Sequence, residues 1–158
     1  MDGLGDTRFS FKNVSEYDVY RAFARVRSRS MGADGISHDM LLFSIDHVIM
    51  VITGLFNMCL QNGEFPTIWK TSIVKPLPKS SKIKTFAELR PICLLPILAK
   101  MLEVLVCDML NEFITENNIL PVIQSGFRRG RSTATALSRV TTDIAKNMDA
   151  SKASCRVE

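Results

Sequence analysis

The sequence predicts an α+β fold that is mainly helical and carries one small antiparallel β-hairpin. Apolar doublets recur every four residues over residues 97–114, which predicts a long, deeply packed helix. Residues 41–60 are apolar around so much of the circumference that this helical region should be central to the fold. Two short strand-like stretches, residues 71–77 and 89–94, are joined by a polar connection and predict the hairpin.

Local signals give the ends of the first two helices. Ser15 followed by Asp18 matches a capping box, and the helix that it opens should end before Gly32. Ser37 can cap the second helix, and the Asn-Gly pair at residues 62–63 stops it. Residues 1–14 are expected to be a ragged N-terminus, so that one domain occupies residues 15–158.

The hairpin should project and carry positive charge. Its first strand places Ile73, Lys75 and Leu77 on one face, and the prolines within it favour an edge position. Residues 80–84 suit the tip, and Arg90 lies on the returning strand. Arg90 could alternatively only cap the next helix or pair with a neighbouring acid.

An arginine-rich turn lies between the last two predicted helices. Residues 124–133 read Gln124-Ser125-Gly126-Phe127-Arg128-Arg129-Gly130-Arg131-Ser132-Thr133. Arginine presents a planar charged fork that suits phosphate oxygens, and Ser132 can cap a following helix whose N-terminus favours anions. Phe127 is expected in the core, and a merely solvated basic loop is the alternative.

Charge distribution favours a polyanion partner. The 158 residues carry a net charge of only +4, yet five lysines and no acid lie between Glu64 and Glu88. Four arginines and no acid lie between Glu116 and Asp143. Nucleic acid is the commonest polyanion, although such charges can also serve solubility alone.

Cysteine use and apolar runs restrict the class of protein. The four cysteines show no paired spacing and only two histidines are present, so no zinc site is expected. Cys59, Cys93 and Cys107 lie among apolar residues and are expected in the core. The absence of a secretory signal favours an intracellular protein of the nucleus or cytoplasm. Because the most apolar stretches contain charged residues, no membrane span is expected.

Five motifs in order resemble one family. They are Gly32-Ala33-Asp34-Gly35-Ile36, Phe65-Pro66-x-x-Trp69-Lys70, Val74-x-Pro76-Leu77-Pro78-Lys79, Leu89-Arg90-Pro91-Ile92-Cys93-Leu94-Leu95 with Lys100 and Glu103, and Gln124-Ser125-Gly126-Phe127-Arg128-x-Gly130-x-Ser132-Thr133. The set resembles the N-terminal part of reverse transcriptases from non-LTR (LINE-type) retrotransposons of the jockey-like group. The likeness runs from about Ser15 to the last residue.

The resemblance implies the fingers and an incomplete palm of a right-hand polymerase. The parent activity would be RNA-directed DNA synthesis, with an RNA template, a DNA primer and a dNTP as partners. By position, Lys79 and Arg90 match the basic pair that contacts the incoming nucleotide. The implied nucleic-acid contacts are Lys70, Lys75, Gln124, Gly126, Arg128, Arg129 and Arg131.

The family's metal-binding aspartates do not occur in these residues. Two-metal catalysis needs clustered carboxylates, and no Asp-Asp pair exists in the sequence. The sequence reaches Val157-Glu158 about where the family's first catalytic strand should begin. No catalytic or metal-binding residue and no cofactor is therefore expected here, although the complete enzyme would use Mg²⁺.

Three functions stay open on the sequence alone. The first is a partial reverse transcriptase domain that is inactive by itself but binds nucleic acid. The second is a domesticated nucleic-acid-binding module. The third is a non-functional protein-interaction remnant, which would self-associate through an exposed surface that normally faces the palm.

Overall fold

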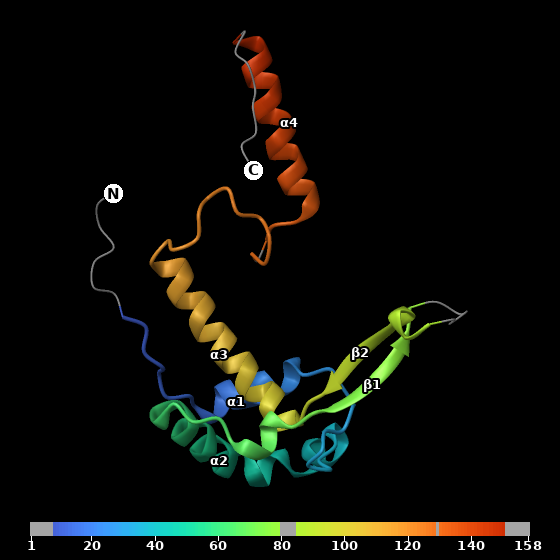
Figure 1. Ribbon diagram of the computed structural model, residues 1–158. Coiled ribbons are helices and arrows are strands. Elements are labelled where there is room, and N and C mark those ends of the chain that lie inside the picture. The colour runs from blue at the N-terminus through green and yellow to red at the C-terminus, as the bar shows by residue number, and fades with distance from the viewer. Residues whose placement is uncertain (1–7, 80–84, 129, 151–158) are drawn as a thin grey trace. The chain divides into compact units, whose positions relative to one another are not determined.

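A computed structural model of the protein describes residues 8–79, 85–128 and 130–150. Its elements in chain order are α1 (Glu16–Arg25), α2 (His38–Asn62), the 3₁₀ turn η1 (Thr67–Lys70), β1 (Ile73–Pro78), the 3₁₀ turn η2 (Phe86–Glu88), β2 (Leu89–Leu94), α3 (Ile97–Glu116) and α4 (Thr133–Asp149) (Figure 1). Within the described residues the structure is mainly helical, with one two-stranded antiparallel sheet, as predicted. The chain divides into two compact units, Met1–Phe113 and Ile114–Glu158.

The first helix begins at the predicted capping box. The Ser15 hydroxyl accepts a hydrogen bond from the Asp18 N–H at 3.2 Å, and the Asp18 carboxylate accepts one from the Ser15 N–H at 2.9 Å. The bonds from the Ser15 side chain and backbone favour the charged carboxylate and lower the pKa of Asp18. The apolar stripe of α1 is buried, with Val19 and Phe23 facing the core.

Asn57 of α2 binds the backbone of Val14, just before α1. The Asn57 Oδ1 atom accepts a hydrogen bond from the Val14 N–H at 2.7 Å, and its Nδ2 atom donates to the Val14 carbonyl at 3.0 Å. Val14 itself is buried. Asn57 therefore satisfies both backbone polar groups of a residue that lies outside any helix or strand.

Helix α2 is continuous and only one of its faces is buried. Ser37 caps its first turn, and Gly63, with a φ of 65°, ends it in the left-handed region, as predicted. The buried residues are Leu41, Ile45, Ile52, Thr53, Phe56, Cys59 and Leu60. The opposite face leaves Phe43 87% and Met50 69% exposed. The helix contributes one face to the hydrophobic core, which fits its expected central place in the fold, while its opposite face is not covered.

Helix α2 is also long and apolar enough, by length and composition, to cross a membrane. It has 25 residues and a mean hydropathy of 1.7. A core helix of a folded domain has the same properties, and α2 contributes to a core that also contains residues of α1 and α3. Asp46 lies inside this helix, and a charged residue within a membrane span is costly.

The hydrophobic core is built from α1, α2, η1 and the first half of α3. Phe56 and Met101 are completely buried, and Ile97 is nearly so. Trp69 is buried and meets the rings of Phe56 and Phe65 edge-on at centroid distances of 6.0 and 5.7 Å. Such contacts between aromatic rings add to the free energy gained from burial.

Burial along α3 fades toward its C-terminus. The doublets at residues 97–105 contribute Ile97, Met101, Leu102 and Leu105 to the core, whereas Leu110 is 38% exposed. The prediction of a long helix is confirmed, but full burial of every doublet is wrong. Val104, Val106 and Met109 are only partly buried where they pack against the core.

Two of the three cysteines assigned to the core are exposed. Cys59 is buried, and this burial raises the pKa of its thiol. Cys93 and Cys107 are exposed. Cys93 lies on a two-stranded ribbon, where its apolar sequence neighbours do not provide a covering layer.

The loop between α1 and α2 passes tightly against the junction of β2 and α3. A Cβ atom at Gly32 would lie 2.5 Å from the Pro96 nitrogen, so only glycine allows this approach. Asp34 accepts a hydrogen bond from the Ile36 N–H at 3.2 Å and is a turn residue. Gly35 follows it with a φ of 73°.

The second unit contains the arginine turn and α4. Ser132 and Thr135 form reciprocal capping hydrogen bonds, which confirms the predicted cap. No residue of α4 is buried, and Leu137, Ile144 and Met148 are exposed along it. Residues 153–158, whose sequence predicts the beginning of a strand, and the predicted hairpin tip at residues 80–84 lie outside the described residues.

Candidate nucleic-acid interface

The β-hairpin rises from two buried anchors. Trp69 fixes η1 just before β1, and Pro96 and Ile97 are buried directly after β2. Burying each large apolar side chain contributes about 1.5–3 kcal/mol. The strands themselves are largely exposed and extend away from the helices of this unit, so the hairpin is a projecting arm with a firm base (Figure 1).

The register assigns the charged residues of the hairpin to one face. The pairs are Ile73–Leu94, Val74–Cys93, Lys75–Ile92, Pro76–Pro91, Leu77–Arg90 and Pro78–Leu89. Directly opposed residues share a face, and faces alternate along each strand. Lys75 and Arg90 therefore lie diagonally on the same face, whereas the other face holds only apolar residues and proline.

Lys79 continues this charged face beyond the end of β1. Its N–H donates to the Glu88 carbonyl at 2.9 Å, which extends the ladder by one pair. Alternation then places Lys79 on the face of Lys75 and Arg90. The Lys79 Nζ atom donates to the Ala87 carbonyl at 2.7 Å, so two of its three donors remain for another acceptor.

Prolines occur in the hairpin without breaking its internal ladder. Pro76 lies directly opposite Pro91, and neither has an N–H to donate. This pair must occupy a position that makes no ladder hydrogen bonds, so the bonded positions are those of Lys75, Leu77 and Lys79. The strand bearing the predicted basic residues therefore keeps its pairing despite its proline content.

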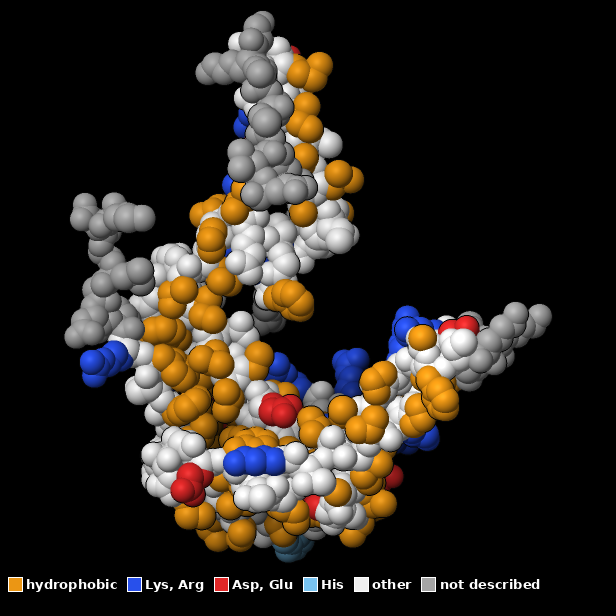
Figure 2. Space-filling view, in the orientation of Figure 1, with side chains coloured by type: hydrophobic (Ala, Val, Ile, Leu, Met, Phe, Trp, Pro, Cys, Tyr) orange, Lys and Arg blue, Asp and Glu red, His pale blue; other side chains and the backbone are white. Residues whose placement is uncertain are grey.

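Charge on this face is accessible. Lys75 and Arg90 are exposed, and no hydrogen bond or ion pair of either side chain is found among the described residues. Basic side chains are visible along the hairpin as blue atoms in Figure 2. A face that combines Lys75, Lys79 and Arg90 with Leu77 and Ile92 offers cations beside apolar surface, as contact with phosphate and base requires.

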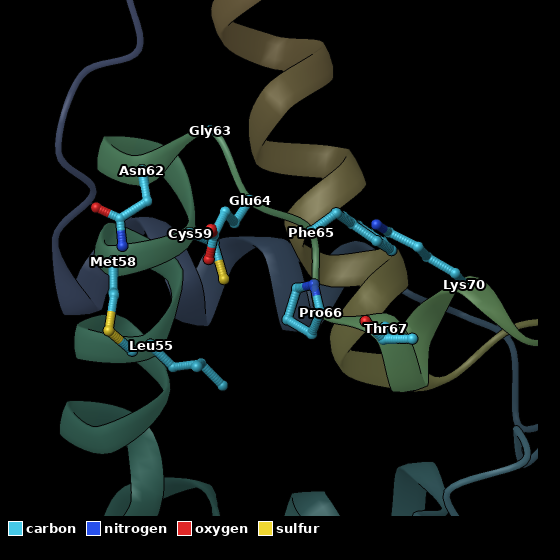
Figure 3. Close-up of a pocket in the computed structure, with 10 residues that line it drawn as sticks. All are labelled: Leu55, Met58, Cys59, Asn62, Gly63, Glu64, Phe65, Pro66, Thr67 and Lys70. Carbon is cyan, nitrogen blue, oxygen red and sulfur yellow. The ribbon is translucent and has the colours of Figure 1, made fainter.

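Lys70 lies apart from the charged face of the hairpin. It lines an open cavity of about 480 Å³ at the C-terminal end of α2, together with Cys59, Glu64, Phe65 and Thr67 (Figure 3). The lining combines an acid, a base and apolar groups in an open groove. It gives Lys70 an exposed position beside η1, before the hairpin begins.

Three arginines of the second unit hold the backbone of their own turn. Arg128 donates to the Pro121 carbonyl at 3.1 Å. Arg131 and Arg139 both donate to the Val122 carbonyl at 2.9 Å. Each guanidinium carries five N–H donors, so most of them remain available to phosphate oxygens. The turn is therefore ordered by the same residues that give it charge.

The remaining predicted residues of the turn are placed as follows. Gln124 Nε2 donates to the Gly126 carbonyl at 3.4 Å. Phe127 has a φ of 56° and is fully exposed, so its assignment to the core is wrong. A positive φ is uncommon for a bulky residue, and it turns this side chain outward. Arg129 lies outside the described residues.

Arg139 was not singled out from the sequence as a site residue. It lies seven residues after the helix cap Ser132, about two turns along α4, and reaches back to the Val122 carbonyl. The available signal was its helical spacing from the cap, which places it on the side of α4 nearest the turn. In the sequence it stands out only as one of the four arginines between Glu116 and Asp143.

No group of three His, Cys, Asp or Glu side chains that could hold a metal ion is found in the part of the chain that the structure describes. Cations predominate among the charged groups of the hairpin and the arginine turn, which suits the binding of anions, although Glu88 lies opposite Lys79.

The chain is similar in sequence to several retrotransposon proteins. The chain is 34% identical over 122 residues, 77% of its length, to "Probable RNA-directed DNA polymerase from transposon BS" of Drosophila melanogaster. The chain is related to the polymerases of non-LTR retrotransposons. It is also 33% identical over 74% of its length to "Probable RNA-directed DNA polymerase from transposon X-element" of the same organism.

The similarity to non-LTR retrotransposons extends to the jockey group, which the sequence motifs resemble. The "RNA-directed DNA polymerase from mobile element jockey" of Drosophila melanogaster is 29% identical over 71% of the chain. The chain spans 14% of the transposon BS protein, 13% of the X-element protein and 12% of the jockey protein. No family model matches the sequence.

Proposed function

We propose that the chain is the part of an RNA-directed DNA polymerase domain that contacts the incoming nucleotide and the template–primer. In this proposal it forms the fingers and the first part of the palm of a right-hand polymerase. The observation that carries the proposal is the hairpin register, which gathers Lys75, Lys79 and Arg90 on one exposed face. The similarity to retrotransposon polymerases supports it.

Lys79 and Arg90 are the proposed contacts to the nucleotide triphosphate. Transfer of a phosphoryl group develops negative charge on the phosphates, and cations placed there stabilise the transition state. Arg90 offers a bidentate fork, and Lys79 offers its two remaining N–H donors. A hairpin with firm anchors at its base can carry these groups over the nucleotide as a lid.

The arginine turn is the proposed contact to the template–primer. Gln124, Gly126, Arg128, Arg129 and Arg131 would line the path of the RNA–DNA duplex. The donors that Arg128 and Arg131 do not use on their own turn can bind backbone phosphates. Lys70 and Lys75 would contact the template farther out.

Catalysis in this proposal needs groups beyond the described residues. The complete enzyme would bind Mg²⁺ through clustered aspartates. The 158 residues contain no Asp-Asp pair, so we propose that they bind substrates but do not extend a primer by themselves. An intracellular location, in the nucleus or the cytoplasm, is part of the same proposal.

The binding proposal is tested by titrating a labelled RNA–DNA duplex at several salt concentrations. The logarithm of the binding constant should fall linearly with the logarithm of the salt concentration, by about 0.9 per phosphate contact. The hairpin variant K75Q/K79Q/R90Q and the turn variant R128Q/R131Q should each bind more weakly and with a smaller slope. Lys146→Gln, a single neutralisation on α4, is the control. Binding that ignores salt, or equal binding by all variants, would refute the proposal.

The assignment of Lys79 and Arg90 has its own measurement. K79Q and R90Q should each bind a dNTP more weakly than the wild type does. The turn variant should bind the nucleotide as the wild type does. A second assay supplies Mg²⁺, primer–template and dNTPs to the 158-residue chain. Extension of the primer would overturn the proposal that these residues do not catalyse synthesis.

Self-association is a second candidate property, favoured by the exposed apolar stripe of α4. Leu137 is 65% and Met148 is 72% exposed. Hydrophobic side chains are visible as orange atoms along α4 in Figure 2. Apolar stripes of this kind commonly face a partner. Sedimentation should give a concentration-dependent mass that L137E/M148E returns to the monomer. A monomer at all concentrations would exclude this candidate.

A further inference from the structure

Two guanidinium groups of the second unit converge on one backbone carbonyl. The Nη1 atoms of Arg131 and Arg139 each donate to the Val122 carbonyl oxygen at 2.9 Å, so these two nitrogens can lie no farther apart than twice that distance. A third guanidinium, that of Arg128, donates to the neighbouring Pro121 carbonyl at 3.1 Å. All of these residues belong to the unit Ile114–Glu158, so their convergence is a property of that unit alone.

No acid is found beside this pair to balance its charge. The sequence has no acidic residue between Glu116 and Asp143, and neither of these two forms an ion pair with Arg131 or Arg139 among the described residues. Helical side chains point toward the N-terminus of their helix, which directs Arg139 toward the turn and away from Asp143. Because like charges this close repel each other, an anion bound by both would stabilise the pair.

Most hydrogen-bond donors of the pair remain unused. A guanidinium carries five N–H groups in a planar fork. The bond to Val122 is the one side-chain hydrogen bond found for each of Arg131 and Arg139 within the described part of the chain. Arg139 is exposed and Arg131 is half-buried, so both can reach a ligand in solution. Two forks held on one carbonyl can therefore bind different oxygens of the same phosphate group.

The surroundings of the pair favour a nucleic-acid strand as the source of the phosphate. The side chains of Val122 and Ile123 are exposed next to the carbonyl that both arginines bind. Sugar and base offer apolar surface beside each phosphate, whereas free phosphate offers none. The carbonyl also holds both guanidinium groups before a ligand binds, which reduces the entropy lost on binding.

We propose that Arg131 and Arg139 form a two-arginine site for a single phosphate group. Arg139 acts with Arg131 on the same phosphate, instead of binding a separate one. The ligand chemistry is a phosphate oxygen, supplied either by a nucleic-acid backbone or by free phosphate. The nucleic-acid source rests on the proposed function, whereas the site itself rests on the convergence of the two side chains on Val122.

Inorganic phosphate tests the site directly. Titration at constant ionic strength, with chloride as the reference anion, should shift the backbone amide NMR signals of Val122, Arg131 and Arg139 in a saturable way. R131Q and R139Q should each lower the phosphate affinity about tenfold. Because both side chains bind one phosphate, R131Q/R139Q should lose less affinity than the two separate losses together predict. Lys146→Gln, a neutralisation farther along α4, should keep the wild-type affinity.

Replacement by lysine separates the shape of the guanidinium from its charge. R139K keeps the positive charge but lacks the planar fork, so its phosphate affinity should fall below that of the wild type. R131K makes the same change outside the helix and should have the same effect. Equal shifts in chloride, wild-type affinity of both lysine variants, or losses from R131Q and R139Q that simply add would each overturn the site. Unchanged amide signals along the rest of α4 verify that each variant is folded.

The RNA–DNA duplex distinguishes the two sources of phosphate. If a backbone phosphate occupies the site, R139Q should reduce the salt slope of duplex binding by about 0.9, whereas R139K should weaken binding with the slope unchanged. An unchanged slope in R139Q, together with phosphate binding that needs Arg139, assigns the site to free phosphate. Failure of the wild type to bind duplex would refute the proposed function, while the phosphate titration would still decide this inference.

Discussion

Gly32 and Gly54 allow one chemical change to be tested with opposite expected results. A Cβ atom at Gly32 would lie 2.5 Å from the Pro96 nitrogen and 2.9 Å from the Leu95 carbonyl carbon. These are backbone atoms of a buried junction and cannot rotate away as a side chain can. Forcing extra volume into a packed site costs about 1–3 kcal/mol. Because the clash is with backbone, we expect Gly32→Ala to reduce the free energy of unfolding by about 3 kcal/mol.

Gly54 is the matched control. It lies within α2, and nothing would contact a Cβ atom there within 4 Å. Alanine in a helix interior is more stable than glycine by about 0.5–1 kcal/mol, so Gly54→Ala should raise the free energy of unfolding by that amount. The free energies of unfolding of the two variants should therefore differ by about 4 kcal/mol, with Gly32→Ala below the wild type and Gly54→Ala above it.

Urea unfolding followed by tryptophan fluorescence measures both effects in the relevant unit. Trp69 is the one tryptophan in the sequence and is 4% exposed in the core of Met1–Phe113. Its emission reports unfolding of this unit without a contribution from the other. The reasoning would be refuted if Gly32→Ala were as stable as the wild type. It would also fail if Gly54→Ala were the less stable variant of the two.

Three further measurements follow from individual side chains. Asn57→Leu should leave both backbone groups of Val14 unsatisfied, lower the free energy of unfolding by about 1–3 kcal/mol and expose the preceding residues to proteolysis; equal protease resistance would contradict this. The lowered pKa of Asp18 means that its contribution to stability is present above the ordinary value of 3.8 and is lost as pH falls below it. Urea unfolding of Asp18→Asn should therefore differ from the wild type at pH 7 and converge with it in acid. The raised pKa of Cys59 means that stability falls as pH rises above the ordinary value of 9.0, and at pH 8 iodoacetamide should modify exposed Cys93 well before Cys59.

Local signals were the most reliable part of the sequence. The serine caps at Ser15, Ser37 and Ser132, the stop at Gly63, and strand β2 are all where the residues predicted them. Each of these depends on hydrogen bonds or backbone angles within a few residues. Such features are decided before distant parts of the chain meet.

Burial was predicted less well, because it depends on what covers a residue. The apolar pattern of α2 could not reveal that Phe43 would be exposed, and the apolar neighbours of Cys93 could not reveal a ribbon without a covering layer. Phe127 was assigned to the core by residue type alone, yet its backbone turns it outward. The exposure of Phe43 and Cys93 depends on residues that lie far away in sequence.

The candidate site also combines local features, which the sequence predicts, with contacts between distant residues, which it does not. Alternation along β1 was enough to place Lys75 with Leu77, and the register then added Arg90 and Lys79 to that face. The contact of Arg139 with the Val122 carbonyl joins residues 17 positions apart. Helical spacing places Arg139 on the side of α4 nearest the turn, but only the folded turn brings the Val122 carbonyl within its reach.

The facing prolines of the hairpin also protect its outer edges. In an antiparallel pair, residues that make no ladder bonds point their backbone groups outward, away from the partner strand. On β1 these are Val74, Pro76 and Pro78, so two of the three outward positions lack an N–H donor; on β2, Pro91 removes another. A foreign strand approaching either edge meets a broken row of donors. A projecting, largely apolar ribbon can thus stay two-stranded instead of templating aggregation through its edges.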